Sequence, residues 1–117
     1  SGVQITRGNL LANLATLSRL FGYAPHARIF NDMILAHADG MIQGPVMALA
    51  NRCAVIRSGG FTLQGIEPWL GRVRLERASH VITVPTIWAT LFMATRGSQP
   101  PHWRWARSRR GIMPACL

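Results

Sequence analysis

The chain has 117 residues, which predicts one domain at most, and its hydrophobic fraction of 49% is typical of a globular protein. Its two Cys fit no disulfide or metal spacing, and no apolar run approaches the roughly 18 residues of a membrane-spanning helix. The net charge of +9 divides unevenly, because residues 1–95 hold eight Arg and four acids, whereas residues 96–117 hold five Arg and no acid. All 13 basic residues are Arg, which indicates a GC-rich coding sequence as readily as a phosphate-binding surface.

The first predicted element is a helix over residues 6–22. Thr6 or Asn9 is suited to cap its start, and Gly22 supplies its stop. Apolar residues recur along it at the spacing of a helix face: Leu10, Leu14, Leu17 and Phe21.

The next two predicted elements are a strand and a buried helix. Residues 28–35 form an apolar run typical of a strand, and the polar residues 36–40 end it. Residues 41–50 are mostly apolar and predict a buried helix, whose first turn is disturbed by Gly44 and Pro45.

A second strand and an amphipathic helix follow. Residues 53–56 are a short apolar run, which residues 57–60 stop. Thr62 is expected to cap the helix. Its predicted buried face carries Leu63, Ile66, Leu70 and Val73.

The last predicted pair begins with a strand over residues 80–84, where His80 reads as a core or edge histidine. Pro85 ends this strand, and Thr86 is expected to cap a helix through Trp88, Leu91 and Phe92.

The order α-β-α-β-α-β-α predicts an α/β fold, with a partial parallel sheet and helical crossovers. Parallel strands need cover on both faces, which predicts a three-layer fragment of a larger domain. The edge strands would stay exposed, so self-association through the sheet edges is expected. Residues 1–95 are interpreted as this partial domain.

Residues 96–117 form a tail without period 2 or period 3.6. One interpretation is an irregular segment, disordered or out of frame. The other is a nucleic-acid-binding arm, in which Trp103 and Trp105 stack on bases while the arginines pair with phosphates.

His37 is the candidate functional residue, because it lies between a predicted strand and a helix, where ligands of parallel α/β sheets collect. A lone His is more often structural, and both readings stay open. Asp39 either orients His37 or caps the following helix. The sequence shows no phosphate-binding glycine loop, no metal-ligand spacing and no catalytic constellation. No signal peptide opens the sequence, so a cytoplasmic location is expected.

Three segments together resemble the acyl-adenylate-forming, AMP-dependent synthetases. Residues 2–10 resemble the segment after that family's phosphate-binding loop, and residues 35–41 resemble its apolar-aromatic-His-x-x-Gly element. Residues 84–86 resemble a further element at the family's spacing. The resemblance covers residues 2–95, and residues 42–44 look most like acyl-CoA ligases.

The resemblance implies a two-step reaction on a carboxylic acid, fatty acids included. The acid attacks the α-phosphate of ATP, with Mg²⁺, to give an acyl-AMP, and a thiol such as coenzyme A then takes the acyl group. His37 would border the acyl pocket and gate access of the carboxylate, and Asp39 and Gly40 would lie beside it. No catalytic, cofactor-binding or metal-binding residue is carried over.

The sequence departs from the family at several positions. Ser1 stands where the phosphate loop has Lys, Arg7 replaces a His, and the later Tyr-Gly-x-Thr-Glu element and catalytic Lys are missing. We therefore expect a fragment of the N-terminal domain, inactive alone. The alternatives are a non-enzymatic basic protein that binds nucleic acid through its tail, and a small self-associating α/β interaction domain.

Overall fold

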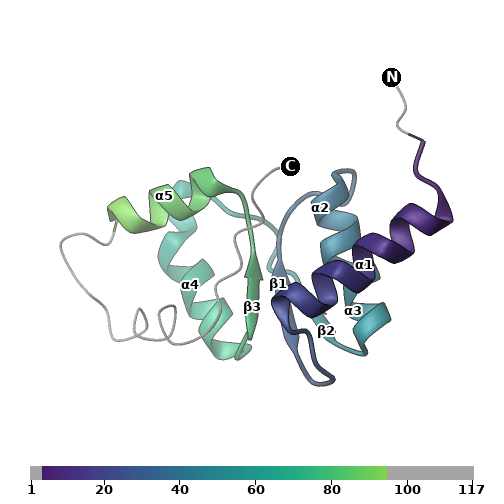
Figure 1. Ribbon diagram of the computed structural model, residues 1–117. Helices are drawn as coiled ribbons and strands as arrows, with labels where there is room; N and C mark the ends of the chain where they lie inside the picture. The colour runs from purple at the N-terminus through teal and green to yellow at the C-terminus, as the bar shows by residue number, and fades with distance from the viewer. Residues whose placement is uncertain (1–3, 95–117) are drawn as a thin grey trace.

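Helices alternate with three strands in the computed structural model, which describes residues 4–94 (Figure 1). The elements, in which η1 is π-helical and η2 is a 3₁₀ turn, are α1 (Arg7–Phe21), β1 (Arg28–Asn31), α2 (Ala38–Met41), η1 (Ile42–Val46), α3 (Met47–Asn51), β2 (Ala54–Ile56), η2 (Leu63–Gly65), α4 (Ile66–Leu75), β3 (His80–Ile82) and α5 (Pro85–Ala94). The predicted α/β class and its alternation are confirmed. No helix of residues 4–94 is long and apolar enough to cross a membrane.

The three strands form a parallel sheet in the order β2-β1-β3, so the first strand in sequence is central. Ile29 of β1 faces Val55 of β2 and His80 of β3 in the register. Figure 1 shows α1, α2 and α3 on one side of the sheet, and α4 and α5 on the other. These are the three layers that the sequence predicts.

Each face of the sheet has its own apolar core, because successive β1 side chains point to opposite faces. Ile29 enters the core under α1 and α3, and Phe30 enters the core under α4 and α5. Both side chains are fully buried, and each such burial contributes about 1.5–3 kcal/mol. The first core also holds Leu14, Tyr23, Ala27, Met47, Ala48 and Ile82, and the second holds Trp69, Val73, Ala78, Val81 and Leu91.

Helix α1 begins and ends at the residues that its sequence predicts. The Asn9 N–H donates to Thr6 Oγ1 at 3.1 Å, and the Thr6 N–H donates to Asn9 Oδ1 at 3.2 Å. This reciprocal pair satisfies backbone donors at the helix start, with Thr6 as the cap. Gly22 ends the helix in the left-handed conformation, at φ 66°.

The strand predicted over residues 28–35 is shorter in the structure, since β1 ends at Asn31. The Asn31 side chain accepts a hydrogen bond from the Met33 N–H at 3.0 Å, which turns the backbone out of the sheet. Ile34 and Leu35 are consequently 71% and 43% exposed, although the sequence pattern places them in the strand.

The two later helices also differ from their predictions at their starts. Thr62 makes no side-chain cap bond, and Leu63 is exposed in the η2 turn, so the buried face of α4 carries Trp69 instead. Helix α5 begins at Pro85 rather than after Thr86. Proline suits a first helical position, because its ring presets φ and its missing N–H would have no partner there.

Candidate functional site

The carboxyl ends of the parallel strands place two loops at one edge of the sheet. The segment from Asp32 to His37 follows β1, and the segment from Arg57 to Thr62 follows β2. We call them the β1 loop and the β2 loop. Ligands of open α/β sheets bind outside these strand ends, so this edge is the candidate site.

His37 is the N-cap of α2, with extended backbone angles (φ −88°, ψ 142°). Its Nδ1 accepts a hydrogen bond from the Asp39 N–H at 3.2 Å. A neutral ring that accepts at Nδ1 carries its proton on Nε2. The side chain is 53% exposed, so the ring is placed to donate from Nε2 to a ligand.

Asp39 lies in the first turn of α2 and is held from two directions. Its Oδ1 accepts from Gln43 Nε2 at 2.7 Å, and its backbone carbonyl accepts from Asn31 Nδ2 at 2.9 Å. Its Oδ2 lies 3.7 Å from His37 Nδ1, too far for a hydrogen bond but close enough for an ion pair with a protonated ring. The cap is His37 itself, so the interpretation of Asp39 as the cap is wrong.

Gly40 brings the start of α2 against the β1 loop. A Cβ at this position would stand 2.0 Å from the Ile34 carbonyl oxygen and 3.0 Å from that of Met33. No other residue fits without moving the backbone, because real Cβ atoms do not approach oxygen so closely. This approach fixes the path of the loop that ends at His37.

Two buried polar residues that sequence reasoning missed support this loop. Asn31 is fully buried at the end of β1, and Gln43 is 6% exposed within the π-helical segment. The Oε1 of Gln43 has no hydrogen-bond donor among the described residues. Both are polar residues within apolar stretches, and this is the signal that would have found them.

Arg57 joins the β2 loop to the β1 loop. Its Nη1 donates to the Asn31 carbonyl at 3.0 Å, and its Nη2 donates to the Met33 carbonyl at 2.8 Å. The Asp32 carboxylate accepts from the Ser58 N–H at 2.6 Å and from the Ser58 hydroxyl. All of these hydrogen bonds run from donors of the β2 loop to acceptors at the end of β1 and in the β1 loop.

The other residues that the sequence singled out lie elsewhere. His80 is buried in β3, with its Nε2 3.1 Å from the Phe21 carbonyl oxygen, so its reading as a core histidine is confirmed. Its ring lies against that of Tyr23, where burial raises the pKa of the phenol and nearby Cys53 raises it further. Burial also raises the pKa of the half-buried Cys53 thiol.

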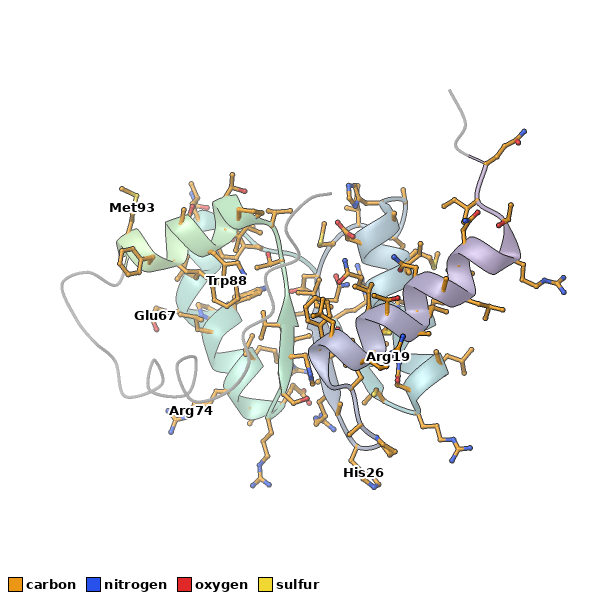
Figure 2. All side chains as sticks on the ribbon, in the orientation of Figure 1. Arg19, His26, Glu67, Arg74, Trp88 and Met93 are labelled. Carbon is orange, nitrogen blue, oxygen red and sulfur yellow. The ribbon has the colours of Figure 1, made fainter. Side chains whose placement is uncertain are left out.

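Figure 2 shows His26 at the end of the molecule away from α2, so it does not contribute to the candidate site. Among residues 4–94, no three His, Cys, Asp or Glu side chains gather where they would hold a metal ion. His102, Cys116, Trp103 and Trp105 lie outside the described residues.

Comparison by sequence gives no match. No family model matches the chain, and no curated protein matches it either.

Comparison by structure gives three informative likenesses. A malonyl-CoA ligase with methylmalonyl-CoA and AMP bound matches with a TM-score of 0.73 and 20% identity, over 96% of this chain and 23% of its own. The o-succinylbenzoate CoA synthetase MenE of Bacillus subtilis matches at 0.69 and 19%, over 86% and 20%. ATP-bound MatB of Rhodopseudomonas palustris matches at 0.62 and 21%, over 84% and 17%.

These likenesses establish the fold, which is that of a part of the adenylate-forming ligases. The chain spans less than a quarter of the length of each of these structures. The alternative of a nucleic-acid-binding arm rests on residues 96–117, outside the described residues, and no comparison supports it.

Proposed function

We propose that this chain is the acyl-pocket portion of a carboxylate-activating, adenylate-forming ligase, and that its β1 loop borders the pocket for the acid. The observation that carries the proposal is the position of His37. It caps α2 at the carboxyl edge of a sheet whose fold matches ligases of malonate and o-succinylbenzoate with coenzyme A. The ordered sequence segments at residues 2–10, 35–41 and 84–86 support the same assignment.

In the reaction of an intact ligase, the acid would attack the α-phosphate of ATP and coenzyme A would then displace AMP. This chain would contribute recognition of the acid before that attack. The exposed His37 ring would donate from Nε2 to the carboxylate of the substrate.

Asp39 and Gly40 would control where His37 points. The Gly40 approach to the Ile34 carbonyl holds the loop, and the Gln43 bond holds the Asp39 carboxylate. The Asp39 N–H donates to Nδ1 at 3.2 Å, which would hold the ring with Nε2 toward the acid.

The role proposed for the described residues is recognition of the acid, by His37 with Asp39 and Gly40 beside it. We propose that residues 1–117 bind the acid and leave its activation to further parts of a ligase.

Titration with carboxylic acids tests the proposal. In ¹H–¹⁵N spectra of the full chain, acetate, malonate and octanoate should shift the amide signals of residues 37–43, with an affinity on the order of millimolar. The shifts should disappear in His37→Ala and persist in His26→Asn. Asn tolerates the positive φ of 78° at position 26, so this variant is a matched control for the loss of one exposed histidine.

Two results would contradict the proposal. One is a set of spectra in which none of the three acids perturbs the signals of residues 37–43. The other is an equal loss of binding in both histidine variants, because a general charge effect would then explain the shifts.

A further inference from the structure

A further pocket lies beside the β2 loop, and His37 is not among its lining residues. Its volume is about 440 Å³, within the ~300–1,000 Å³ typical of small-molecule sites. One wall is the β2 loop, with Arg57, Ser58 and Gly60. The other wall is one face of α4 and the turn before it, including Gly65, Trp69 and Arg72.

The residues that line this pocket carry positive charge. Arg57 and Arg72 both line it, and no acidic residue among residues 4–94 does. Arg57 donates to two backbone carbonyls, which orient its guanidinium without neutralising it. A cation held in this way keeps its charge for a ligand.

Two acids close to this pocket offset part of its positive charge. Glu76 lies 2.8 Å from Arg72, and its other oxygen lies 2.7 Å from Arg28, so one carboxylate serves two guanidinium groups. Asp32 accepts from the lining residues Ser58 and Trp69, whose donors are neutral, so it keeps its negative charge at the wall. Arg28, Arg57 and Arg72 still outnumber Asp32 and Glu76, which leaves an excess of one positive charge in this group.

The β2 loop leaves room for a ligand. Gly60 has a φ of 119°, and no heavy atom of the described residues lies within 4 Å of the place where its Cβ would stand. Trp69 and Pro68 provide an apolar surface on the opposite wall. A polar group can thus lie between the two arginines while the remainder of a small molecule contacts the helix.

We propose that this pocket binds the phosphate group of a small phosphorylated molecule. Guanidinium groups match phosphate because their planar N–H donors pair with two oxygens at once. A phosphate group carries nearly two negative charges at neutral pH, whereas a carboxylate carries one. Two guanidinium groups therefore match a phosphate better than they match a carboxylate. This site is independent of the acid-binding role of the His37 loop.

Calorimetric titration of the full chain with inorganic phosphate, at constant ionic strength, tests the proposal. Arg72→Gln should weaken binding about tenfold, the effect of losing one charged hydrogen-bond partner. Arg74→Gln should leave the affinity unchanged. Arg74 lies on the same helix but does not line the pocket, and Figure 2 shows it pointing outward. Both variants lose one positive charge, so non-specific attraction to the remaining arginines falls equally.

Glu76→Gln separates ligand binding from a structural role of the Arg72–Glu76 pair. The proposal expects this variant to bind phosphate at least as tightly as the parent chain, because Arg72 is released. Phenyl phosphate identifies the source: tighter binding than inorganic phosphate indicates a phosphomonoester, and equal binding indicates free phosphate. The proposal is overturned if no phosphate binds, if Arg72→Gln and Arg74→Gln bind alike, or if Glu76→Gln weakens binding as much as Arg72→Gln.

Discussion

The β1 loop and the β2 loop leave the same edge of the sheet, but their glycines are required for different reasons. Gly40 is required because the backbone comes so close that a Cβ would stand 2.0 Å from a carbonyl oxygen. Gly59 and Gly60 have φ of 103° and 119°, with open space around both. A close backbone contact therefore constrains the first loop at Gly40, whereas Gly59 and Gly60 constrain the second loop through their own backbone angles.

This difference indicates which loop suits recognition of one defined group and which suits a ligand that requires adjustment. A loop held by a close approach and by buried amides presents its side chain in one orientation, which suits recognition of a defined group by His37. In the second loop, Gly59 and Gly60 are bordered by open space, so this part adjusts its shape to a ligand more readily than the part that holds Arg57 and Ser58. Arg57, which spans from the second loop to the first, anchors the base of both.

The largest expected effect comes from removing the close approach. Gly40→Ala should lower the free energy of unfolding by about 3 kcal/mol or more, because the backbone of the β1 loop must move to admit a methyl group. Gly71→Ala is the matched control. Its methyl group meets no atom within 4 Å, so this variant should be slightly more stable than the parent. Urea denaturation measures both, and equal stabilities would refute the contact.

Asn31→Ala should be the next most damaging change, at about 2 kcal/mol, since the partly buried Met33 N–H and Asp39 carbonyl would both lose their partner. Asn13→Ala, on the exposed side of α1, should change stability by less than about 0.5 kcal/mol. Thermal unfolding of the two variants compares them. A similar loss in both would mean that the β1 loop does not depend on the Asn31 amide.

Gly60→Ala should cost about 1 kcal/mol, because only backbone strain at positive φ opposes it. The loss should therefore be smaller than that of Gly40→Ala, although both replace a loop-edge glycine. Denaturant midpoints of the two variants, measured side by side, sharpen the contrast between the loops. A Gly60→Ala loss as large as that of Gly40→Ala would show that the β2 loop is equally constrained.

His37→Ala should have the smallest effect on stability, about 0.5 kcal/mol, since its cap bond is solvent-exposed. His37→Asn should retain the cap and restore that loss while still lacking the ring. Chemical denaturation measures the capping role of His37, and titration of the same samples with carboxylic acids measures its binding role. If His37→Asn binds carboxylic acids as the parent does, the ring is not the recognition group.

The elements of this fold were predictable where the signal is local. Thr6 and Gly22 cap α1 within its own sequence, and the spacing of apolar runs indicated three parallel strands. The buried face of α4 was less predictable, because its first turn is 3₁₀ and shifts the phase of the apolar stripe. Leu63 is therefore exposed, whereas Trp69 lies on the buried face of the helix.

The candidate site was predictable only in part. The position of His37 after a strand pointed to the carboxyl edge, and the structure places it there. Arg57 was missed because its partners, the Asn31 and Met33 carbonyls, lie 26 and 24 residues away in the sequence. Gln43 bonds Asp39 four residues away, but its burial depends on how the π-helical segment packs. The role of Gly40 likewise depends on a contact with Ile34 that no local pattern reports.

The central strand β1 is synthesised well before the neighbours that pair with it in the sheet. Arg28 and Ser79, whose backbones meet where β1 joins β3, are 51 residues apart. At roughly 5–20 residues per second, a ribosome needs about 3–10 s to make that interval. The middle strand β1 is thus synthesised first, but it gains its second neighbour only when β3 has been made. Chaperone binding to the nascent chain should be strongest during those seconds, before β3 emerges.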